Sequence, residues 1–594
     1  LFGIAMLDYL DLYKWFIPVR QESYRLNHIG EVELGETKVE NPYDTFKDFY
    51  TKDFQKFVEY NIQDVEIVDG LEDKLGLIDL SLTFAYETKV NYNDIFSQVR
   101  VWDTLIANHL MTKKICVPPR EDHIKDTKYE GAYVKEPRLG MQKWVVSFDI
   151  NSLYPHIIVQ YNISPEKILG VDSSSVSVNK MLSKKTPLDY LKTEGACITP
   201  NGAMFKRDSQ GFLPEMIEKI YKDRVIYKKR ELKAQKEYQK NPTNDLKKEI
   251  ARCHNVQWAR KIALNSCYGA IGNQYFRYYD IAQASAVTTA GQYIIRNIEQ
   301  KVNEYLNQIL QTHNEVDYIL ASDTDSIYVS FDKLVEKTCK DKTDQQVCDF
   351  IAKVCDNKLE PFIAKQFEDI ADYTNAFKNC MVMKREVIAD KGIWVAKKRY
   401  MLNVLDDEGV RLAQPKLKLM GIEAVKSSTP QVCRVKIKEA IEVIMSKEQT
   451  DLHKLVAEFR KEFMKLPAEA IAFPRSCNNV KKYRDHSNIF IKGTPIHVKG
   501  ALIYNYQIQK LGLKNKYPFI QEGDKIKFIK LVPANPFKFD VISYVTQLPK
   551  EFNLQEYIDY EVQFEKTFLD PMRFILNSIG WEHEKRANLE EFFG

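Results

Sequence analysis

The sequence predicts a mixed α/β protein that is divided into several domains. Its 594 residues allow about three to five domains of ordinary size. Residues 144–148 are apolar and β-branched, as expected of a buried strand. Residues 215–239 and 245–267 instead carry helix-forming side chains with no internal proline or glycine. Both patterns occur in the same region of the chain, so we expect strands and helices to pack together in an α/β (α+β) fold.

The composition is that of a folded protein. Apolar residues make up 44% of the chain and charged residues 28%, which excludes wholesale disorder. No run of 18 uncharged apolar residues is present, and the first residues lack the features of a signal peptide. The ten scattered cysteines have no zinc-type spacing and are typical of free thiols in a reducing compartment. We therefore expect a soluble, cytoplasmic protein without a membrane span. Leu1 in place of an initiator methionine indicates that the natural chain begins upstream or was cut.

The order of predicted elements suggests where domains change. Residues 57–68 read as an acidic helix, and prolines and glycines near 115–140 mark a change to loop and strand, where we expect a new domain to begin. Residues 173–186, with three consecutive serines, predict a surface loop. Residues 281–310 predict another helix. Beyond Pro430 the pattern is helical to about 470, then irregular with β-like pieces, then helical again.

Positive charge is concentrated in the two helices predicted at 215–239 and 245–267. From Lys219 to Lys261 there are 14 lysines and arginines against five acidic residues. The linking segment 241–244 predicts a turn with Asn244 as N-cap, so the helices should run antiparallel. Such a stretch is either a solvated helix face or a surface that binds phosphate.

Polar side chains recur at spacings of four on the second of these helices. Gln257, Lys261 and Asn265 share one face, and Tyr268 and Gly269 follow. With Arg224 on the preceding helix, this face could contact a triphosphate and stack on a base. The alternative is a polar solvent face with Tyr268 in the core.

Carboxylates stand at the ends of two predicted strands. Asp149 follows the strand at 144–148, and residues 317–329 read as strand, turn, strand with Asp323 and Asp325 at the tip. Side chains two apart share a face of a strand, and carboxylates placed so close need a cation. A site with only a small number of hard oxygen ligands suits Mg²⁺, because this ion takes its remaining ligands from water and phosphate. The alternative for Asp323 and Asp325 alone is ordinary turn chemistry.

A third basic element follows the apolar strand predicted at 393–396. Residues 397–400 (Lys-Lys-Arg-Tyr) are either a charged strand end or a phosphate clamp. The sequence contains no Walker-type loop, dinucleotide glycine motif, His-Glu-x-x-His or nucleophile elbow. The chemistry that these residues favour is therefore phosphoryl transfer by bare metal ions.

Taken in order, four of these segments resemble the successive motifs of family B DNA polymerases. They are Asp149–Pro155 (Asp-Ile-Asn-Ser-Leu-Tyr-Pro), Lys261–Gly269, Asp323–Asp325 and Lys397–Tyr400. The flanking residues 276–280 and 426–430 resemble in particular the replicative polymerases of T-even bacteriophages and their relatives. The likeness covers essentially the whole chain. It implies a DNA-directed DNA polymerase that extends the 3′ end of a primer on template DNA with deoxynucleoside triphosphates and two Mg²⁺ ions, for which Mn²⁺ can substitute.

The resemblance also implies a right-hand architecture of palm, fingers and thumb preceded by a partial exonuclease domain. The implied divisions are 1–77 as the C-terminal remnant of a 3′ to 5′ exonuclease domain, 78–120 as a connecting segment, 121–210 as the first segment of the palm, 211–273 as fingers, 274–425 as the second segment of the palm, and 426–594 as thumb with a C-terminal clamp-binding tail.

Site residues carry over by position. The resemblance implies Asp149, Asp323 and Asp325 as catalytic, with Asp149, Asp325 and Ile150 at the metals and Glu386 near them. It implies nucleotide binding by Ile150, Ser152, Leu153, Tyr154, Arg224, Lys228, Lys261 and Asn265, with Tyr154 under the sugar. It implies DNA binding by Tyr268, Gly269, Lys397, Lys398, Arg399 and Tyr400. Two departures stand out: His156 replaces a common serine, and Ala132 replaces a common glycine.

The two ends of the chain predict further features. Tyr60 and Asp64 resemble the last exonuclease motif, whereas the earlier motifs would lie before Leu1. We therefore expect no 3′ to 5′ exonuclease activity, and a separate polypeptide could carry the absent motifs. At the other end, Leu589, Phe592 and Phe593 share one side of a helical turn. The resemblance favours docking of this tail into a sliding clamp, and the alternative is that it folds back on the thumb.

Rival functions are an RNA-copying or RNA-making enzyme and a scaffold that only binds primer-template. Tyr154 at a sugar-excluding position argues against the first, and clustered carboxylates argue against the second.

Overall fold

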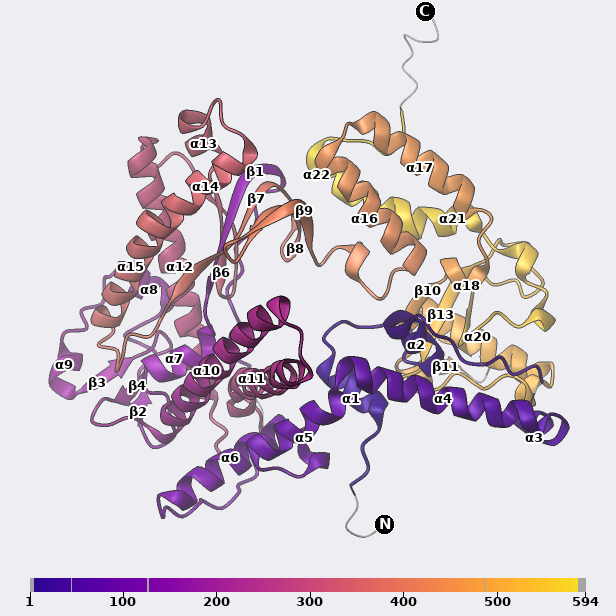
Figure 1. Ribbon diagram of the computed structural model, residues 1–594, viewed down its shortest axis with the longest axis horizontal. Coiled ribbons are helices and arrows are strands. Elements are labelled where there is room, and N and C mark those ends of the chain that lie inside the picture. Colours follow the sequence, from indigo (N-terminus) through magenta and orange to yellow (C-terminus); the bar gives the residue numbers. More distant parts are fainter. Residues whose placement is uncertain (1–4, 44, 125–127, 486, 586–594) are drawn as a thin grey trace, which may run out of the picture.

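A six-stranded antiparallel sheet lies in the left-hand half of the computed structural model in Figure 1. The structure describes residues 5–43, 45–124, 128–485 and 487–585. The strand order is β5-β6-β1-β7-β8-β9. The bounds are β1 Gly140–Ile150, β5 Ile319–Asp323, β6 Ser326–Ser330, β7 Met383–Ala396, β8 Arg399–Asp407 and β9 Val410–Met420. This confirms the strands predicted at 144–148 and 393–396 and the strand, turn, strand at 317–329. Since β1 lies inside the sheet, its residues are fixed from both sides.

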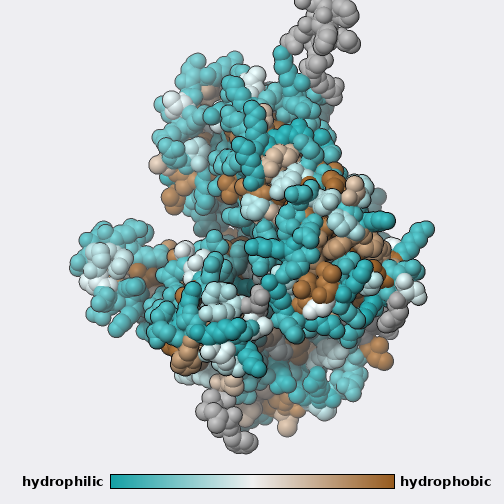
Figure 2. All heavy atoms as spheres, turned by 90° about the vertical axis from the view of Figure 1, so that its right-hand side faces the viewer, coloured by the Kyte–Doolittle hydropathy of each residue, from teal (hydrophilic) through white to brown (hydrophobic). Residues whose placement is uncertain are grey.

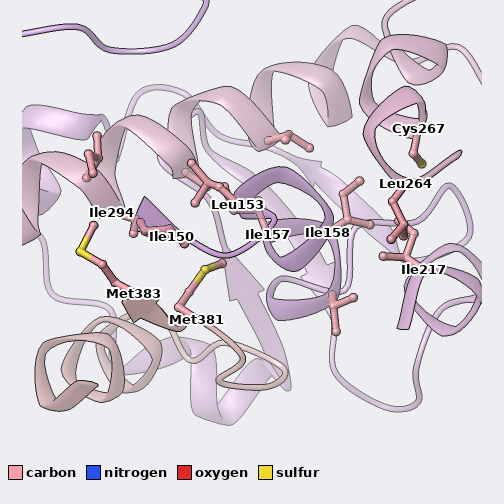
Figure 3. Packing of buried hydrophobic residues seen from close by; sticks show 14 of the residues in the cluster. Ile150, Leu153, Ile157, Ile158, Ile217, Leu264, Cys267, Ile294, Met381 and Met383 are labelled. Atoms are coloured by element: carbon pink, nitrogen blue, oxygen red, sulfur yellow. The ribbon is translucent and has the colours of Figure 1, made fainter. Parts of the chain in front are cut away.

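Helices cover one face of this sheet. Val146, Phe148 and Ile150 of β1 join the larger apolar core, whereas Val145 belongs to a small cluster on the opposite face. The covering helices include α7 (Leu153–Gln160), α12 (Ile281–Leu310) and α15 (Glu360–Tyr373). Every residue of α7 except Tyr154 is buried. Figure 3 shows this short helix enclosed by apolar side chains from several segments, so the turn before it is held firmly.

Two long helices form a hairpin beside the sheet. They are α10 (Phe212–Lys240) and α11 (Asn244–Ile271), close to the predicted ranges. The predicted N-cap at Asn244 is wrong. Thr243 is the N-cap: its backbone is extended, and its hydroxyl accepts a hydrogen bond from the amide of Leu246 at 3.3 Å. Asn244 is already the first helical residue, because the threonine before it caps the helix by accepting a hydrogen bond from a free amide of the first turn.

The chain before the sheet is helical. It contains α1 (Tyr9–Phe16), α2 (Leu26–Leu34), α3 (Phe46–Lys52), α4 (Phe54–Leu75), α5 (Leu77–Thr88) and α6 (Gln98–Thr112). Helices α5 and α6 pack on α11. The buried carboxylate of Glu22 pairs with Arg434 at 2.6 Å and with Lys527 at 3.7 Å. These front helices therefore bridge the hairpin and the C-terminal region of the chain (Figure 1).

The C-terminal region has its own apolar core. It contains α16 (Gln431–Ser446), α17 (Gln449–Phe463), α18 (Ala468–Ile471), a sheet of β10 (Phe473–Ser476), β13 (Lys525–Lys530) and β14 (Val541–Tyr544), then α20 (Ile496–Lys510), α21 (Tyr560–Phe564) and α22 (Asp570–Ile579). The predicted order of helix, β-like pieces and helix is confirmed up to residue 579. Figure 2 looks onto this end and shows a mainly hydrophilic surface with a few apolar patches.

Smaller elements complete the described chain. The loop predicted at 173–186 is interrupted by α8 (Val178–Leu182), which Ser177 caps by accepting a hydrogen bond from the amide of Lys180. The others are β2 (Ile168–Val171), α9 (Tyr190–Glu194), β3 (Ala196–Ile198), β4 (Ala203–Lys206), α13 (Asp332–Thr338), α14 (Asp344–Val354), α19 (Val480–Tyr483), β11 (Arg484–Asp485), β12 (Ile489–Phe490), the 3₁₀ turns at 92–94, 423–425, 513–515, 550–552 and 555–557, and the π-helical turns at 355–359 and 565–569.

The ten cysteines are all free thiols, as predicted, and Cys116 is exposed. Among the helices that the structure describes, none combines the length and apolarity needed to cross a bilayer.

Candidate active site

Asp149 and Asp325 are brought together by neighbouring strands. Asp149 lies near the end of β1, opposite Ser326 of β6 on one side and Lys384 of β7 on the other. Asp325 lies in the tight β5–β6 turn, where Thr324 has a left-handed backbone. The carbonyl of Asp325 accepts a hydrogen bond from the amide of Ile150 at 2.8 Å. The end of β1 and the turn are therefore joined through their backbones, which brings the two aspartates together.

The two carboxyl groups are partly buried and repel each other. Burial raises the pKa of Asp149 to about 7, and the negative charges of Asp325 and Glu386 add to the effect. Burial also raises the pKa of Asp325 to about 6, together with the charges of Asp323 and Glu386. Among the described residues neither carboxylate has an ion-pair partner, whereas nearby Asp323 and Glu386 each have one. The site therefore carries negative charge that a cation would neutralise.

Glu386 lies close to this pair on β7. Its carboxylate accepts a hydrogen bond from the hydroxyl of Ser147 at 3.0 Å and pairs with Lys418 of β9 at 2.6 Å. Sequence analysis missed both partners. Ser147 precedes Asp149 by two residues, so strand alternation could have placed it on the same face. Lys418 gave no local signal, because only the pairing of strands brings it near.

Asp323 differs from Asp325. Its carboxylate pairs with Lys398 at 2.7 Å and accepts a hydrogen bond from Thr324 at 3.1 Å. Lys398 occupies the turn between β7 and β8 with a left-handed backbone. Of the segment 397–400, the structure thus brings Lys398 to the acidic site.

The other three residues of that segment have separate partners. Lys397 pairs with Glu136 at 2.9 Å, and Arg399 pairs with Glu423 at 2.5 Å. Tyr400 is buried, with its hydroxyl 2.6 Å from that of Tyr328. A role of these side chains in holding DNA stays a prediction.

The turn between β1 and α7 presents backbone amides. Ser152 has a left-handed backbone, with φ of +49°, and α7 begins without a side-chain cap. The amides of the first helical turn have no acceptor within the helix. Ser152 and Leu153 therefore stand where an anion could accept hydrogen bonds, and the binding of phosphate that the resemblance implies for them stays a prediction.

An aromatic layer lies next to this turn. The rings of Tyr154 and Tyr268 are 4.8 Å apart, and the Tyr268 hydroxyl donates to that of Tyr129 at 3.2 Å. A side chain on Gly291 would lie 3.3 Å from the Tyr154 ring, so helix α12 supports the tyrosine from behind. Gly269 lies against α6, where a Cβ would approach Gln98 to 2.9 Å. Its predicted contact with a base pair stays a prediction.

Unbalanced positive charge lies on the hairpin. Burial lowers the pKa of Lys261, and the nearby cations Arg224 and Lys228 lower it further. Burial also lowers the pKa of Arg224, and in the described region of the chain its buried Nε has no hydrogen-bond partner. Asn265, which lies on α11 with Lys261, is exposed. Cations that are desolvated and have no ion pair among the residues that the structure describes favour an anionic ligand.

A pocket of about 600 Å³ connects the two charged regions. Its lining includes Asp149 and Glu386 on the sheet, Lys228 on α10, and Lys384 on β7. Its charged lining consists of three cations, Lys228, Lys384 and Arg385, and of five carboxylates, Asp149, Asp356, Glu360, Glu386 and Glu408. A lining of both signs fits a ligand that combines phosphate with divalent cations.

The donor set fits a hard cation. Asp149 and Asp325 offer carboxylate oxygens, and Ile150 can offer only its backbone carbonyl. The described residues contain no group of three or more His, Cys, Asp and Glu side chains that would hold a metal alone. A cation here would therefore take its remaining ligands from water or substrate, as Mg²⁺ does.

Tyr60 and Asp64 lie one turn apart on α4 and share a lysine. Lys38 Nζ is 2.7 Å from the Asp64 carboxylate and 4.5 Å from the centre of the Tyr60 ring. The helix at 57–68 is confirmed, so Asp64 and Glu66 diverge. Leu589, Phe592 and Phe593 lie outside the described residues.

Comparison with known proteins agrees with this geometry. The model of DNA polymerase family B matches residues 95–488. The DNA-directed DNA polymerase of Escherichia phage RB69 is 36% identical over the whole chain and 70% of its own length. That of Enterobacteria phage T4 is 33% identical over the whole chain and 71% of its length. DNA polymerase 1 of Sulfolobus acidocaldarius is 23% identical over 99% of this chain and 60% of its own. The chain therefore belongs to DNA polymerase family B and is a DNA-directed DNA polymerase.

Proposed function

We propose that this chain extends a primer 3′ end by two-metal nucleotidyl transfer at Asp149 and Asp325. The observation that supports this most is the pair of partly buried carboxylates, neither of which has an ion-pair partner among the described residues. Asp149 lines a pocket that Lys228 of the hairpin also lines. An attacking hydroxyl and a triphosphate need that combination, since one carries developing negative charge and the other carries it already.

The residues would share the work as follows. Two Mg²⁺ ions, or Mn²⁺ in their place, held by Asp149, Asp325 and the Ile150 carbonyl, would activate the primer hydroxyl and stabilise the leaving pyrophosphate. Arg224, Lys228, Lys261 and Asn265 would bind the triphosphate from the hairpin, and the amides of Ser152 and Leu153 would bind it from the sheet. Tyr154, supported by Tyr268 and Gly291, would pack under the sugar and leave no room for a 2′-hydroxyl.

The same proposal assigns the regions of the hand. The sheet with its covering helices, 121–210 and 274–425, would be the palm, the hairpin at 211–273 the fingers, and 426–594 the thumb. The support is that the hairpin leaves and rejoins the sheet region, and that the C-terminal region has a separate core. Residues 1–77 would be the remnant of an exonuclease domain and 78–120 the connecting segment.

Primer extension by the purified chain with Mg²⁺ and deoxynucleoside triphosphates tests the proposal. Asp149→Ala and Asp325→Ala should abolish nucleotide addition and leave primer-template binding largely intact, because lysines and arginines hold the phosphates. Substantial turnover in either variant would contradict the assignment. Binding without extension by the wild type would favour a scaffold, and a preference for ribonucleotides would favour an RNA-making enzyme.

We further propose that this chain lacks 3′ to 5′ exonuclease activity. Such a site needs several carboxylates to hold its metals, whereas Asp64 is paired with Lys38. The test is release of labelled nucleotide from a single-stranded 3′ end with Mg²⁺ and no added nucleotide. Degradation that is lost in Asp64→Ala would contradict this. Degradation that depends on an added polypeptide with the other motifs would point to a split enzyme.

We also propose that residues 589–594 bind a sliding clamp through Leu589, Phe592 and Phe593. Deleting them should spare synthesis on short templates and remove stimulation by the cognate clamp. Retained stimulation would contradict the proposal. The likeness to polymerases of bacteriophages supports the proposal that this chain works in the cytoplasm of a bacterial host.

A further inference from the structure

His156 lies between the turn that precedes α7 and helix α10 of the hairpin. The residue is 8% exposed. Its ring nitrogen Nδ1 is 2.6 Å from the backbone carbonyl oxygen of Asn151. Its ring also meets the ring of Tyr221 on α10 edge to face, with centroids 4.5 Å apart. One side chain thus contacts both the turn before α7 and helix α10 of the hairpin.

The hydrogen bond to Asn151 sets the tautomer of His156 and the direction of a peptide group. A carbonyl oxygen can only accept, so Nδ1 carries the proton and donates. The peptide that joins Asn151 to Ser152 is planar and trans, so its N–H points opposite to its carbonyl. When His156 holds the carbonyl on its own side, the amide of Ser152 must face away from His156.

The turn needs this support because its backbone is strained. Ser152 has a left-handed conformation, which costs free energy for a residue other than glycine. The other end of Asn151 is anchored by its own amide, which donates to the carbonyl of Val382 at 3.0 Å. With both ends of Asn151 held, the orientation of the Ser152 amide is fixed before any ligand binds.

We propose that His156 is a positioning residue that aims the Ser152 amide at the triphosphate of the incoming nucleotide. This inference rests on the proposed function, in which that amide binds phosphate. The contact with Tyr221 gives His156 a second positioning role. Tyr221 stands three residues before Arg224 on α10, so the His156 ring also fixes α10 relative to the turn. The Ser152 amide and the Arg224 guanidinium are thereby set at a fixed distance for one ligand.

Two substitutions separate the hydrogen bond from packing. In His156→Asn the side-chain amide stands near the position of Nδ1 and can still donate to Asn151. In His156→Gln the amide reaches the position of Nε2 instead and the bond is lost. We expect the KM for deoxynucleoside triphosphate to rise about tenfold in His156→Gln, which is the loss of one buried hydrogen bond. In His156→Asn the KM should stay within about twofold of the wild type.

The turnover number and DNA binding complete the readout. A phosphate contact that is present in both the ground state and the transition state affects KM and not kcat. We therefore expect kcat and the Kd for primer-template to stay within about twofold in both variants. With a dideoxy-terminated primer, the equilibrium Kd for nucleotide should shift as KM does.

Cys380→Ala is the matched control, because the Cys380 thiol contacts the backbone carbonyl of His156 at 3.3 Å and leaves the turn alone. Its KM should be unchanged.

Several outcomes would overturn the proposal. An unchanged nucleotide KM in His156→Gln would show that the bond does not position the amide. Equal increases in His156→Gln and His156→Asn would show that packing alone matters. If His156→Gln does not fold, His156→Leu replaces it in the comparison, and a KM equal to that of His156→Asn would again overturn the proposal. Absence of extension by the wild type would instead reject the proposed function.

Discussion

The acidic site at the end of β1 and the middle of helix α4 contain the same residue types, aspartate and tyrosine, but in different electrostatic surroundings. In the first, Asp149 and Asp325 lie near each other and Asp325 lies near Tyr154, and burial and neighbouring negative charges raise the pKa of both carboxyl groups. In the second, Asp64 stands one turn from Tyr60, and its carboxylate lies 2.7 Å from the ammonium of Lys38. Burial alone would lower the pKa of Lys38, but its bonds to Asp64 and Tyr60 raise it overall.

The difference between the two regions is the counter-charge. A partly buried carboxylate that already has a lysine is a structural contact, and a cation would have to displace that lysine. A pair of carboxylates without an ion-pair partner in the described region of the chain is less stable as it stands and gains from binding a cation. The comparison teaches that the spacing of aspartates finds candidate sites, whereas the partners of those aspartates separate a metal site from a salt bridge.

The strongest test compares Asp149→Asn with Asp64→Asn in primer extension. Asp149→Asn should lower the single-turnover rate by about a thousandfold, since metal ligation supplies several kcal/mol and each 1.4 kcal/mol is tenfold. Asp64→Asn should change the rate by less than about twofold, as a substitution away from the site does. A large loss in the Asp64 variant would erase the contrast between the regions.

The tyrosines of the two regions give a second comparison. Tyr154→Ala should raise the use of ribonucleotides relative to deoxynucleotides by roughly tenfold to hundredfold, because a pocket that excludes one small group by contact discriminates by about that factor. Tyr60→Ala should leave the ratio as it is. The measurement is the kcat/KM for each nucleotide type on one template. An unchanged ratio in Tyr154→Ala would reject the steric role of its ring.

Much of the architecture could be predicted because it depends on local pattern. The buried strand at 144–148, the two basic helices and the helix at 281–310 follow from periodicity and from the absence of proline and glycine. The approach of Asp149 and Asp325 also followed, since each was placed at a strand end.

What could not be predicted depends on contacts between distant residues. Lys418, Lys398 and Lys38 each neutralise a carboxylate, and each lies far from that carboxylate in sequence. The N-cap at Thr243 was missed for a different reason, since Thr243 and Asn244 are both good caps and only the backbone decides between them.

Removing the lysine in the second region should cost stability without affecting catalysis. Lys38→Met leaves Asp64 half-buried without a partner, and one of its oxygens already lacks a hydrogen bond in the described region of the chain. We expect a loss of about 1 to 3 kcal/mol in the free energy of unfolding of the front helices, measured by urea denaturation. Lys38→Arg should retain most of the stability, and primer extension should be normal in both. Wild-type stability in Lys38→Met would show that the pair contributes little.

The smallest effect that we expect is a change in folding stability, which should have opposite signs for substitutions in the two regions. In EDTA, Asp149→Asn removes one of two carboxylates that repel each other, and we expect the protein to gain about 0.5 to 2 kcal/mol of stability, as relief of an unfavourable charge at a functional site often gives. Asp64→Asn removes the partner of a half-buried lysine and should lower stability in the same buffer.

Adding Mg²⁺ should then stabilise the wild type and Asp64→Asn, because a ligand that binds only the folded state shifts the equilibrium toward it. It should stabilise Asp149→Asn much less. Thermal melts of the three proteins with and without Mg²⁺ measure both signs. If Mg²⁺ stabilises Asp149→Asn as much as the wild type, the cation binds elsewhere, and the uncompensated charge at the end of β1 needs another explanation.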